Sequence, residues 1–275
     1  MPQRGQRSNR ARGHIVASGG PRRATPRKVG VGGEQVEGRR AVFELLRAKR
    51  RKIHEIWFDQ DLDRTGIVAE IAELALQRGV PLVSVARGRF ERAVASDASQ
   101  GVVAFAQPLD DQPLGQLIRA RSGLGNVVVL DHVSDPRNLG AILRSAECAG
   151  FIGAVLAERR ATKVTPTVTK SAAGAIEYLR FSVVPGIPAA LEELKELGMW
   201  IVGLDPSATT SIYDLDLLDA PVALVLGSEG KGLARLVRER CDALASIPQF
   251  GKIDSLNVSA AATVALFETS RRKRS

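Results

Sequence analysis

Residues 126–148, NVVVLDHVSDPRNLGAILRSAEC, place an apolar strand directly before a helix. The first six residues, NVVVLD, are rich in valine, which is typical of a strand buried on both faces of a sheet. After Asn138 the apolar residues recur at helical spacing as far as Cys148. A buried strand followed by a helix is the repeating unit of an α/β fold with a parallel sheet.

The same alternation continues to the end of the chain. Further strands are predicted at residues 153–156, 179–184, 199–204, 222–226 and 243–247. Helices are predicted from Pro166, with Thr165 as the N-cap, and at residues 187–197, 232–239 and 257–269. We therefore predict a mostly parallel sheet that is covered by helices on both faces.

A smaller α/β unit precedes this one. Its helices are predicted at residues 38–48, 65–78 and 87–94, and its strands at 53–58, 81–85 and 101–106. Residues 108–113 (PLDDQP) read as a linker, followed by a helix that ends near Arg121. The sequence thus predicts a basic arm over residues 1–33, a small domain over 34–107 and a larger domain over 108–275.

The net charge of +9 on 275 residues is carried by the tails. Residues 1–33 contain eight basic residues and no acid, and residues 271–274 add four more, which leaves 27 bases against 30 acids elsewhere. Residues 1–33 also contain almost no large apolar side chains, so we predict disorder there. Basic arms of this kind commonly contact polyanions, usually nucleic acid; a solvated tail that only aids solubility is the alternative.

Composition argues against several classes of protein. No stretch approaches the roughly 18 uninterrupted apolar residues that a membrane helix needs, and the start has neither a secretory apolar region nor the amphipathic stretch of a transit peptide. Two cysteines and three scattered histidines give neither a disulfide framework nor metal-ligand spacing, and we interpret His132 and Cys148 as structural. We predict a cytoplasmic protein without a structural metal.

Polar and glycine residues follow three of the predicted strands, where ligands of parallel sheets bind. After residues 126–131 come Asn138, Gly140 and Arg144. After residues 222–226 comes the turn GSEGKG, which contains one carboxylate, Glu229. After residues 243–247 a loop leads to Ser255, Leu256 and Asn257.

Each of these segments also has a purely structural interpretation. The turn GSEGKG lacks the pattern of a Walker loop and of a dinucleotide fingerprint, so Lys231 is not interpreted as a phosphate ligand. Taken alone, it is an ordinary turn between a strand and a helix. Asn257 alone is an ordinary N-cap, and Arg144 alone is a surface residue of a helix.

Together, in this order and at these separations, the segments resemble the three signature motifs of the SpoU–TrmH methyltransferases of the SPOUT superfamily. The matching positions are Asn138, Gly140, Ala141 and Arg144; Gly227, Glu229, Gly230 and Gly232; and Ile247, Pro248 and the run SLNVS at 255–259. Weaker similarity covers Thr165, Pro166, Lys170 and the AGA at 173–175, and in the small domain Gly38, Arg39, Ala41, Val42 and the QGV at 100–102. The chain departs from the family at Ser99, where histidine is frequent, and at Ala172, where serine is frequent.

This resemblance implies a fold that strand counting does not. The larger domain would form a deep trefoil knot, an arrangement that is otherwise almost absent from proteins. The small domain would be a substrate-binding module of the ribosomal protein L30e-like type, and the methyltransferase domain would form a homodimer. S-adenosyl-L-methionine would bind against the backbone of Gly227, Ile247 and Leu256.

The resemblance also implies a catalytic set, Asn138, Arg144, Glu229, Ser255 and Asn257. Arg144 matches the family's catalytic arginine. Because a guanidinium is almost never deprotonated, we interpret Arg144 as a clamp on the ribose and a neighbouring phosphate, while substrate phosphate or water accepts the proton. Arg144 acting as the base itself is the rival account.

The predicted reaction is methylation of an RNA ribose 2′-hydroxyl. The pairing of domains most resembles the enzymes that modify a guanosine of 23S ribosomal RNA, and transfer RNA is the alternative substrate. A catalytically inactive RNA-binding homologue is a further alternative, disfavoured because the set Asn138, Arg144, Glu229 and Asn257 is intact. A nucleotide-phosphate enzyme is disfavoured because the lysine–hydroxyl pair of a Walker loop is missing.

Overall fold

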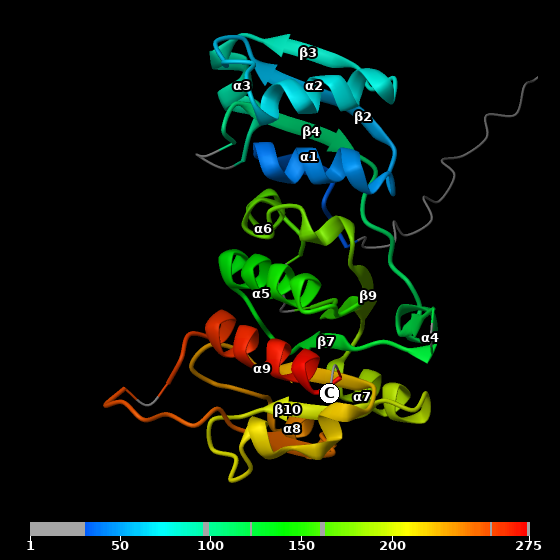
Figure 1. Ribbon diagram of the computed structural model, residues 1–275, viewed down its shortest axis with the longest axis vertical. Helices are drawn as coiled ribbons and strands as arrows, with labels where there is room; N and C mark the ends of the chain where they lie inside the picture. Colours follow the sequence, from blue (N-terminus) through cyan, green and yellow to red (C-terminus); the bar gives the residue numbers. More distant parts are fainter. Residues whose placement is uncertain (1–30, 96–98, 122, 160–162, 254, 274–275) are drawn as a thin grey trace, which may run out of the picture.

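The computed structural model describes residues 31–273, except 96–98, 122, 160–162 and 254. Two α/β units lie one above the other along the longest axis, with the smaller, N-terminal one uppermost in Figure 1. Most of the predicted basic arm, residues 1–30, lies outside the described residues. Residues 31–33, which we assigned to the arm, are ordered instead, because Val31 is buried in the core of the larger unit and Gly32 pairs with Val164.

The smaller unit is built on a four-stranded sheet. Its strand order is β1 (Gln35–Glu37), β4 (Val102–Ala106), β2 (Ile53–Asp59) and β3 (Leu82–Val85), and only β2 and β3 run parallel. The helices α1 (Arg39–Ala48) and α2 (Ile67–Gln77) form one core with the sheet, and α3 (Arg87–Ala93) packs through Phe90 in a second core. These helices and three of the strands lie where predicted; the three-residue strand β1 was too short to show a periodic pattern.

The larger unit is built on a six-stranded sheet in which every pairing is parallel, as predicted. Its order is β12 (Ala243–Ala245), β10 (Trp200–Leu204), β11 (Val222–Leu226), β7 (Val127–Leu130), β8 (Gly153–Ala157) and β9 (Arg180–Val184). From β7 the chain builds outward through β8 and β9 and then crosses to the other side of β7. The strand order therefore reverses between β7 and β11, which is where ligands bind in open parallel sheets.

Helices cover both faces of this sheet (Figure 1). Val128 and Leu130 face one core, together with residues of α5 (Pro136–Cys148), α6 (Pro166–Ser171) and α9 (Val258–Arg272). Val127 and Val129 face the other core, with residues of α4 (Leu114–Leu117), α7 (Ile187–Glu196) and α8 (Arg235–Arg240). Alternate residues of β7 thus serve opposite cores, as the period of a strand requires. No helix of the described residues is both long enough and apolar enough to cross a membrane.

Two predicted helices differ from those observed. The helix expected to end near Arg121 stops at Leu117, and the chain turns back in a hairpin of β5 (Arg119–Ala120) and β6 (Gly123–Leu124). Gly123 has a φ of 116°, which glycine adopts without strain, so it permits this reversal. The helix expected from Gly232 starts only at Arg235, because residues 228–232 close a separate turn.

Candidate active site

A buried carboxylate joins the ends of β7 and β11 at the point where the strand order reverses. The backbone N–H of Asp131 donates to the carbonyl of Leu226 over 2.8 Å. Its side chain is buried and accepts from the N–H of Ala234 over 2.8 Å through one oxygen and hydrogen-bonds Nδ1 of His132 through the other. The segments that follow β7 and β11 are therefore held against each other. Sequence reasoning missed Asp131, although an acid at the carboxyl end of an apolar strand was the available signal.

The turn after β11 closes tightly on itself. The backbone groups of Ser228 and Gly232 exchange two hydrogen bonds of 3.0 Å, which leaves Glu229 at the exposed tip. Gly227 is buried, and a Cβ at this position would lie 2.2 Å from the carbonyl carbon of Gly232. Only glycine fits there, since no Cβ approaches backbone so closely. The glycine of this segment is thus required by packing, and the turn exposes backbone beside it.

The segment after β7 starts α5. Asp135 is the N-cap, and its carboxylate accepts from the N–H of Arg137 over 2.9 Å and from Nδ2 of Asn138 over 3.3 Å. We expected the helix to follow Asn138, which could cap it or hydrogen-bond at its start; instead Asp135 takes the cap position, and Asn138 lies buried in the first turn, where it hydrogen-bonds Asp135. Arg144 lies in the same helix and is exposed, and among the described residues no carboxylate forms an ion pair with it.

The third segment leads into α9, whose N-cap is Asn257. Its Oδ1 accepts from the N–H of Ser259 over 2.9 Å and from the Ser259 hydroxyl over 2.6 Å. The Thr263 hydroxyl donates to the carbonyl of Ser259 over 2.8 Å and lies 2.7 Å from the hydroxyl of Ser145, the neighbour of Arg144. The start of α9 is therefore tied to the middle of α5.

The remaining predicted site residues lie on the loop that precedes α9. Ile247 is half-buried and packs against the core that holds α5 and α9. Ser255 and Leu256 are exposed, the latter with 44% of its surface accessible. Within the described residues, hydrogen bonds join the first segment to the third and, through Asp131, to the second; none joins Glu229 or Asn138 to Arg144.

A second cluster lies where the two units meet. The N–H of Gly38 donates to the carbonyl of Val102 over 3.1 Å, and Arg39 donates to the backbone and side-chain carbonyl oxygens of Gln100, each over 3.1 Å. A Cβ at Gly38 would lie 3.8 Å from Cγ of Lys170, which belongs to α6 of the larger unit. Three segments with weaker similarity to the family thus converge on this joint, away from the ends of β7 and β11.

The joint itself is fastened by a buried ion pair. Arg51 of the smaller unit and Glu177 of the larger one have side chains that are 3% and 1% exposed. Nε of the guanidinium donates to one carboxylate oxygen over 2.9 Å, and Nη2 donates to the other. The remaining nitrogen donates to the carbonyls of Gly33 and Gln107 over 2.8 and 2.7 Å. Because all three nitrogens of this guanidinium donate hydrogen bonds, the cost of burying its charge is compensated.

Metal and thiol chemistry find no support in the described residues. They contain no group of three or more His, Cys, Asp and Glu side chains that could hold a metal ion. Burial raises the pKa of Cys241 to about 12 and also raises that of Cys148, so neither thiol is activated as a thiolate.

Family profiles match both units of the chain. The SpoU rRNA Methylase family matches residues 125–267, and the family described as RNA 2′-O ribose methyltransferase substrate binding matches residues 35–112. Among solved structures, the SpoU methyltransferase AviRb from Streptomyces viridochromogenes, in complex with the cofactor AdoMet, is similar with a TM-score of 0.73 and 25% identity. That similarity covers 88% of this chain and 90% of AviRb.

Sequence relatives agree with these matches. A Bacillus subtilis protein assigned to the TrmH family of tRNA/rRNA methyltransferases is 37% identical over 243 residues, covering 87% of this chain and 96% of the relative. The 23S rRNA (guanosine-2′-O-)-methyltransferase RlmB of Ralstonia nicotianae is 38% identical over 237 residues, covering 86% of this chain and 94% of the relative. The chain, with its parallel sheet and its N-terminal substrate-binding unit, belongs to the SpoU family of RNA methyltransferases.

Proposed function

We propose that this methyltransferase acts on the ribose 2′-hydroxyl of a guanosine in 23S ribosomal RNA. The carrying observation is that all three predicted motif segments follow the carboxyl ends of strands in one parallel sheet, and that the start of α9 is tied to the middle of α5, which carries the exposed Arg144. The relatives named for 23S ribosomal RNA, at 35–38% identity, support the substrate. Transfer RNA is the alternative, because the Bacillus relative is assigned to both classes.

S-adenosylmethionine supplies the methyl group, as a sulfonium that the 2′-oxygen attacks. Backbone groups of Gly227, Ile247 and Leu256 would hold it. The local structure is consistent with this role, since Gly227 directly precedes the closed turn of residues 228–232, whose tip is exposed. Leu256 is 44% exposed on the loop before α9, so this residue is accessible from solvent.

We assign Arg144 to the acceptor ribose and an adjacent phosphate. Its guanidinium is exposed and lacks an ion pair within the described residues, so it is available to an anionic substrate. Because a guanidinium keeps its protons, we assign the proton of the 2′-hydroxyl to a substrate phosphate or water. Asn138 and Glu229 would orient the site, and Ser255 and Asn257 would fix the third segment. Arg144 as the base remains the rival mechanism.

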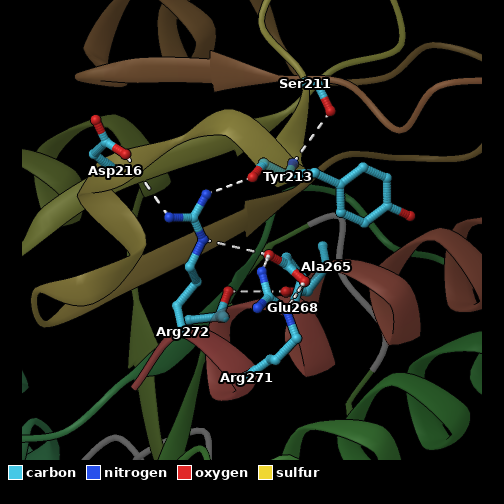
Figure 2. A network of polar contacts seen from close by, with 8 residues as sticks. Ser211, Tyr213, Asp216, Ala265, Glu268, Arg271 and Arg272 are labelled. Atoms are coloured by element: carbon cyan, nitrogen blue, oxygen red, sulfur yellow. Dashed lines mark hydrogen bonds and ion pairs between the residues drawn. The ribbon is translucent and has the colours of Figure 1, made fainter. Parts of the chain in front are cut away.

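We also propose that the larger domain, residues 108–275, is knotted. The chain leaves β12 at one edge of the sheet, yet α9 packs against α5 and β11 near its middle. The connection between β10 and β11 wraps the end of α9, where Arg272 donates to the carbonyl of Tyr213 and approaches Asp216 within 3.8 Å (Figure 2). A terminal segment threaded through that connection produces these contacts. An experimental chain trace with α9 outside the connection would contradict the knot.

The other proposals concern assembly, domain type and compartment. We propose that residues 34–107 form an L30e-like substrate-binding domain, and that the methyltransferase domains form a homodimer in the cytoplasm. Phe267 of α9 is 47% exposed, which provides apolar surface for a partner subunit. Light scattering that gives the mass of a monomer at micromolar concentration would contradict the homodimer.

Two measurements test the function. Calorimetry should detect binding of S-adenosylhomocysteine, and a ligand at one hundred times its Kd should stabilise the fold by about 2.7 kcal/mol. Mapping of 2′-O-methylation should then show one guanosine of 23S ribosomal RNA unmodified in cells that lack the protein. A missing methyl group in transfer RNA would favour the alternative substrate. No binding at millimolar ligand would instead favour an inactive RNA-binding homologue.

A further inference from the structure

The outward face of α1 presents two arginines around one aromatic ring. The guanidinium carbons of Arg40 and Arg47 lie 5.4 and 5.6 Å from the ring centroid of Phe43, within the range of a cation–π interaction. Their side chains remain 61% and 54% exposed. Both planar cations are therefore held in position while most of their surface is open to a ligand.

A nearly buried carboxylate organises this face from below. Glu44, whose side chain is 9% exposed, lies 2.8 Å from the guanidinium of Arg40 and 3.6 Å from that of Arg47. It also accepts a hydrogen bond of 2.7 Å from the hydroxyl of Tyr178. One carboxylate faces two guanidinium groups, so the group keeps a net positive charge.

Tyr178 belongs to the other domain. It follows the short helix η1 (Ala175–Glu177) and is 45% exposed. Burial of the hydroxyl, the hydrogen bond to Glu44 and the charge of Glu147 on α5 raise the pKa of Tyr178 to about 12, so the phenol stays neutral. Glu147 lies one turn along α5 from Arg144. The surface thus runs from α1 across the joint to the helix that carries Arg144, and α1 lies above α6 and α5 in Figure 1.

The two halves of this surface cannot move apart freely. Gly174 lies so close to α1 that a Cβ there would be 2.4 Å from Cβ of Glu44. The buried pair of Arg51 and Glu177 lies at the same joint. The spacing between Phe43 on one domain and Tyr178 on the other is therefore fixed before any ligand binds, which lowers the entropy cost of binding.

We propose that Arg40, Phe43, Arg47 and Tyr178 grip unpaired nucleotides of the RNA substrate. A base would stack on the ring of Tyr178 and others on the guanidinium planes that Phe43 holds in place, and the guanidinium groups would bond phosphates. An unpaired segment fits because its bases are free to leave their own stack, whereas paired bases present only their edges. The proposal rests on the proposed function. It adds that the RNA contacts this surface and that the contacted segment is unpaired.

The charge of this surface is tested by the double variant Arg40→Gln/Arg47→Gln. Anisotropy should give the affinity for a fluorescent oligoribonucleotide without secondary structure over a series of salt concentrations. Loss of two phosphate contacts should flatten the slope of log affinity against log salt by about 1.4 units. The matched control is Arg87→Gln, an exposed arginine of α3 that also pairs four residues along its helix, with Glu91. It should leave the slope unchanged.

The ring of Tyr178 is tested separately. Tyr178→Leu should weaken binding of the unpaired oligonucleotide about tenfold, whereas Tyr178→Phe, which keeps the ring and loses only the hydrogen bond to Glu44, should stay close to wild type. A duplex of equal length should compete poorly.

Distinct results separate this proposal from the proposed function. The proposed surface would be contradicted by any of three results. The folded variants of Arg40, Arg47 and Tyr178 could keep the wild-type affinity and salt slope, Arg87→Gln could lose as much as the double variant, or the duplex could compete as well as the unpaired oligonucleotide. Failure of the wild-type protein to methylate ribosomal RNA would overturn the function instead.

Discussion

At the scale of single residues, Arg144 differs from those arginines of the larger domain that are engaged in ion pairs. Arg238, Arg240 and Arg271 are each within 3.0 Å of a carboxylate oxygen. Arg144 is exposed without such a partner among the described residues, although its charge acts on the thiol of Cys148 one turn along the helix. A cation left without an anion is suited to bind one from the substrate.

Arg144→Ala should therefore abolish methyl transfer while the affinity for S-adenosylhomocysteine stays within a few-fold. The proposed cofactor contacts are backbone groups of other segments, which this substitution does not touch. Calorimetry for the ligand and a methyl-transfer assay on ribosomal RNA measure the two effects. The control is Arg235→Ala on α8, across the sheet, which should change neither. Near wild-type turnover in Arg144→Ala would remove this residue from the mechanism.

At the scale of elements, α9 is fastened at both ends. Asn257 caps its start, and at its end Glu268 accepts from Arg271 over 2.7 and 2.8 Å and lies 3.4 Å from Arg272 (Figure 2). These contacts stabilise the two ends of the helix itself, whereas the hydroxyl pair of Thr263 and Ser145 joins it to α5 and Arg272 joins it to the connection that precedes β11. The helix that follows the proposed cofactor loop, α9, is thus stabilised at both of its ends.

Asn257→Ala should lower the free energy of unfolding by about 1 kcal/mol, since the first turn loses its cap. It should also weaken S-adenosylhomocysteine binding and turnover, because Asn257 directly follows Leu256 of the cofactor loop. Thr165→Ala removes the N-cap of α6, far along the chain from that loop, and serves as the control. A similar loss of stability with unchanged ligand affinity is expected for it. Equal ligand affinities in the two variants would separate Asn257 from the cofactor site.

Glu268 gives α9 a dependence on pH. The hydrogen bonds from Arg271 lower the pKa of Glu268 below its ordinary value near 4.3. The positive charge of Arg271 and the contact with Arg272 act in the same direction. A carboxylate with a lowered folded pKa stabilises the fold above the unfolded pKa, and this contribution is lost as pH falls through the folded pKa. Glu268→Gln should lower Tm at pH 7, and the difference from wild type should shrink as pH falls below the unfolded pKa. Glu239→Gln, in the exposed pair with Arg235, should show no such difference.

Elements with a strong periodic pattern were predictable and their boundaries were less so. The valines of β7 and the helical spacing of α5 identified both elements. A strand buried on both faces is a continuous apolar run, and a helix buried on one face repeats its apolar residues every three or four positions. The start of α5 was predicted after Asn138 but lies at Pro136, since Asp135 and Asn138 are both good caps and only the fold decides between them. The bond from Asp131 to Ala234 spans 103 residues, so no local pattern could indicate it.

At the scale of the molecule, the joint makes the two domains one body. Arg51 of the smaller domain bonds Glu177 of the larger one and also donates to the carbonyls of Gly33 and Gln107. The backbone N–H of Gly33 donates to the carbonyl of Val164 over 2.8 Å. The segments that the sequence linked to substrate binding therefore lie on a surface with a fixed position relative to Arg144.

Arg51→Met should destabilise the protein by about 3–5 kcal/mol, because it leaves the charge of Glu177 buried and unpaired. The double variant Arg51→Met/Glu177→Leu should recover most of that loss, since no charge then remains buried. Chemical denaturation measures both. Arg240→Met, in an exposed pair with Glu192, should cost no more than about 1 kcal/mol. A double variant as unstable as Arg51→Met would show that packing, and not charge, determines the loss.

The basic N-terminal segment should supply much of the long-range attraction to RNA. Residues 1–30 carry all eight positive charges of the predicted arm and no acid, whereas the chain between the tails has 27 bases against 30 acids. If about four of these charges engage phosphates, deletion of residues 1–30 should flatten the slope of log affinity against log salt by roughly three units. Residues 31–33 are retained because they pack against the larger domain.

Deletion should weaken RNA binding most at low salt and leave both cofactor affinity and the methylated nucleotide unchanged, because phosphate contacts position the RNA without specifying its sequence. The control is a chain of full length in which all eight basic residues of the segment are replaced by glutamine. If charge is the cause, this chain should behave like the deletion, since length alone contributes no counterion release. An unchanged slope in both would mean that the segment does not contact RNA. A changed methylation site would mean that it reads the RNA, which the composition of the segment, nearly devoid of large apolar side chains, argues against.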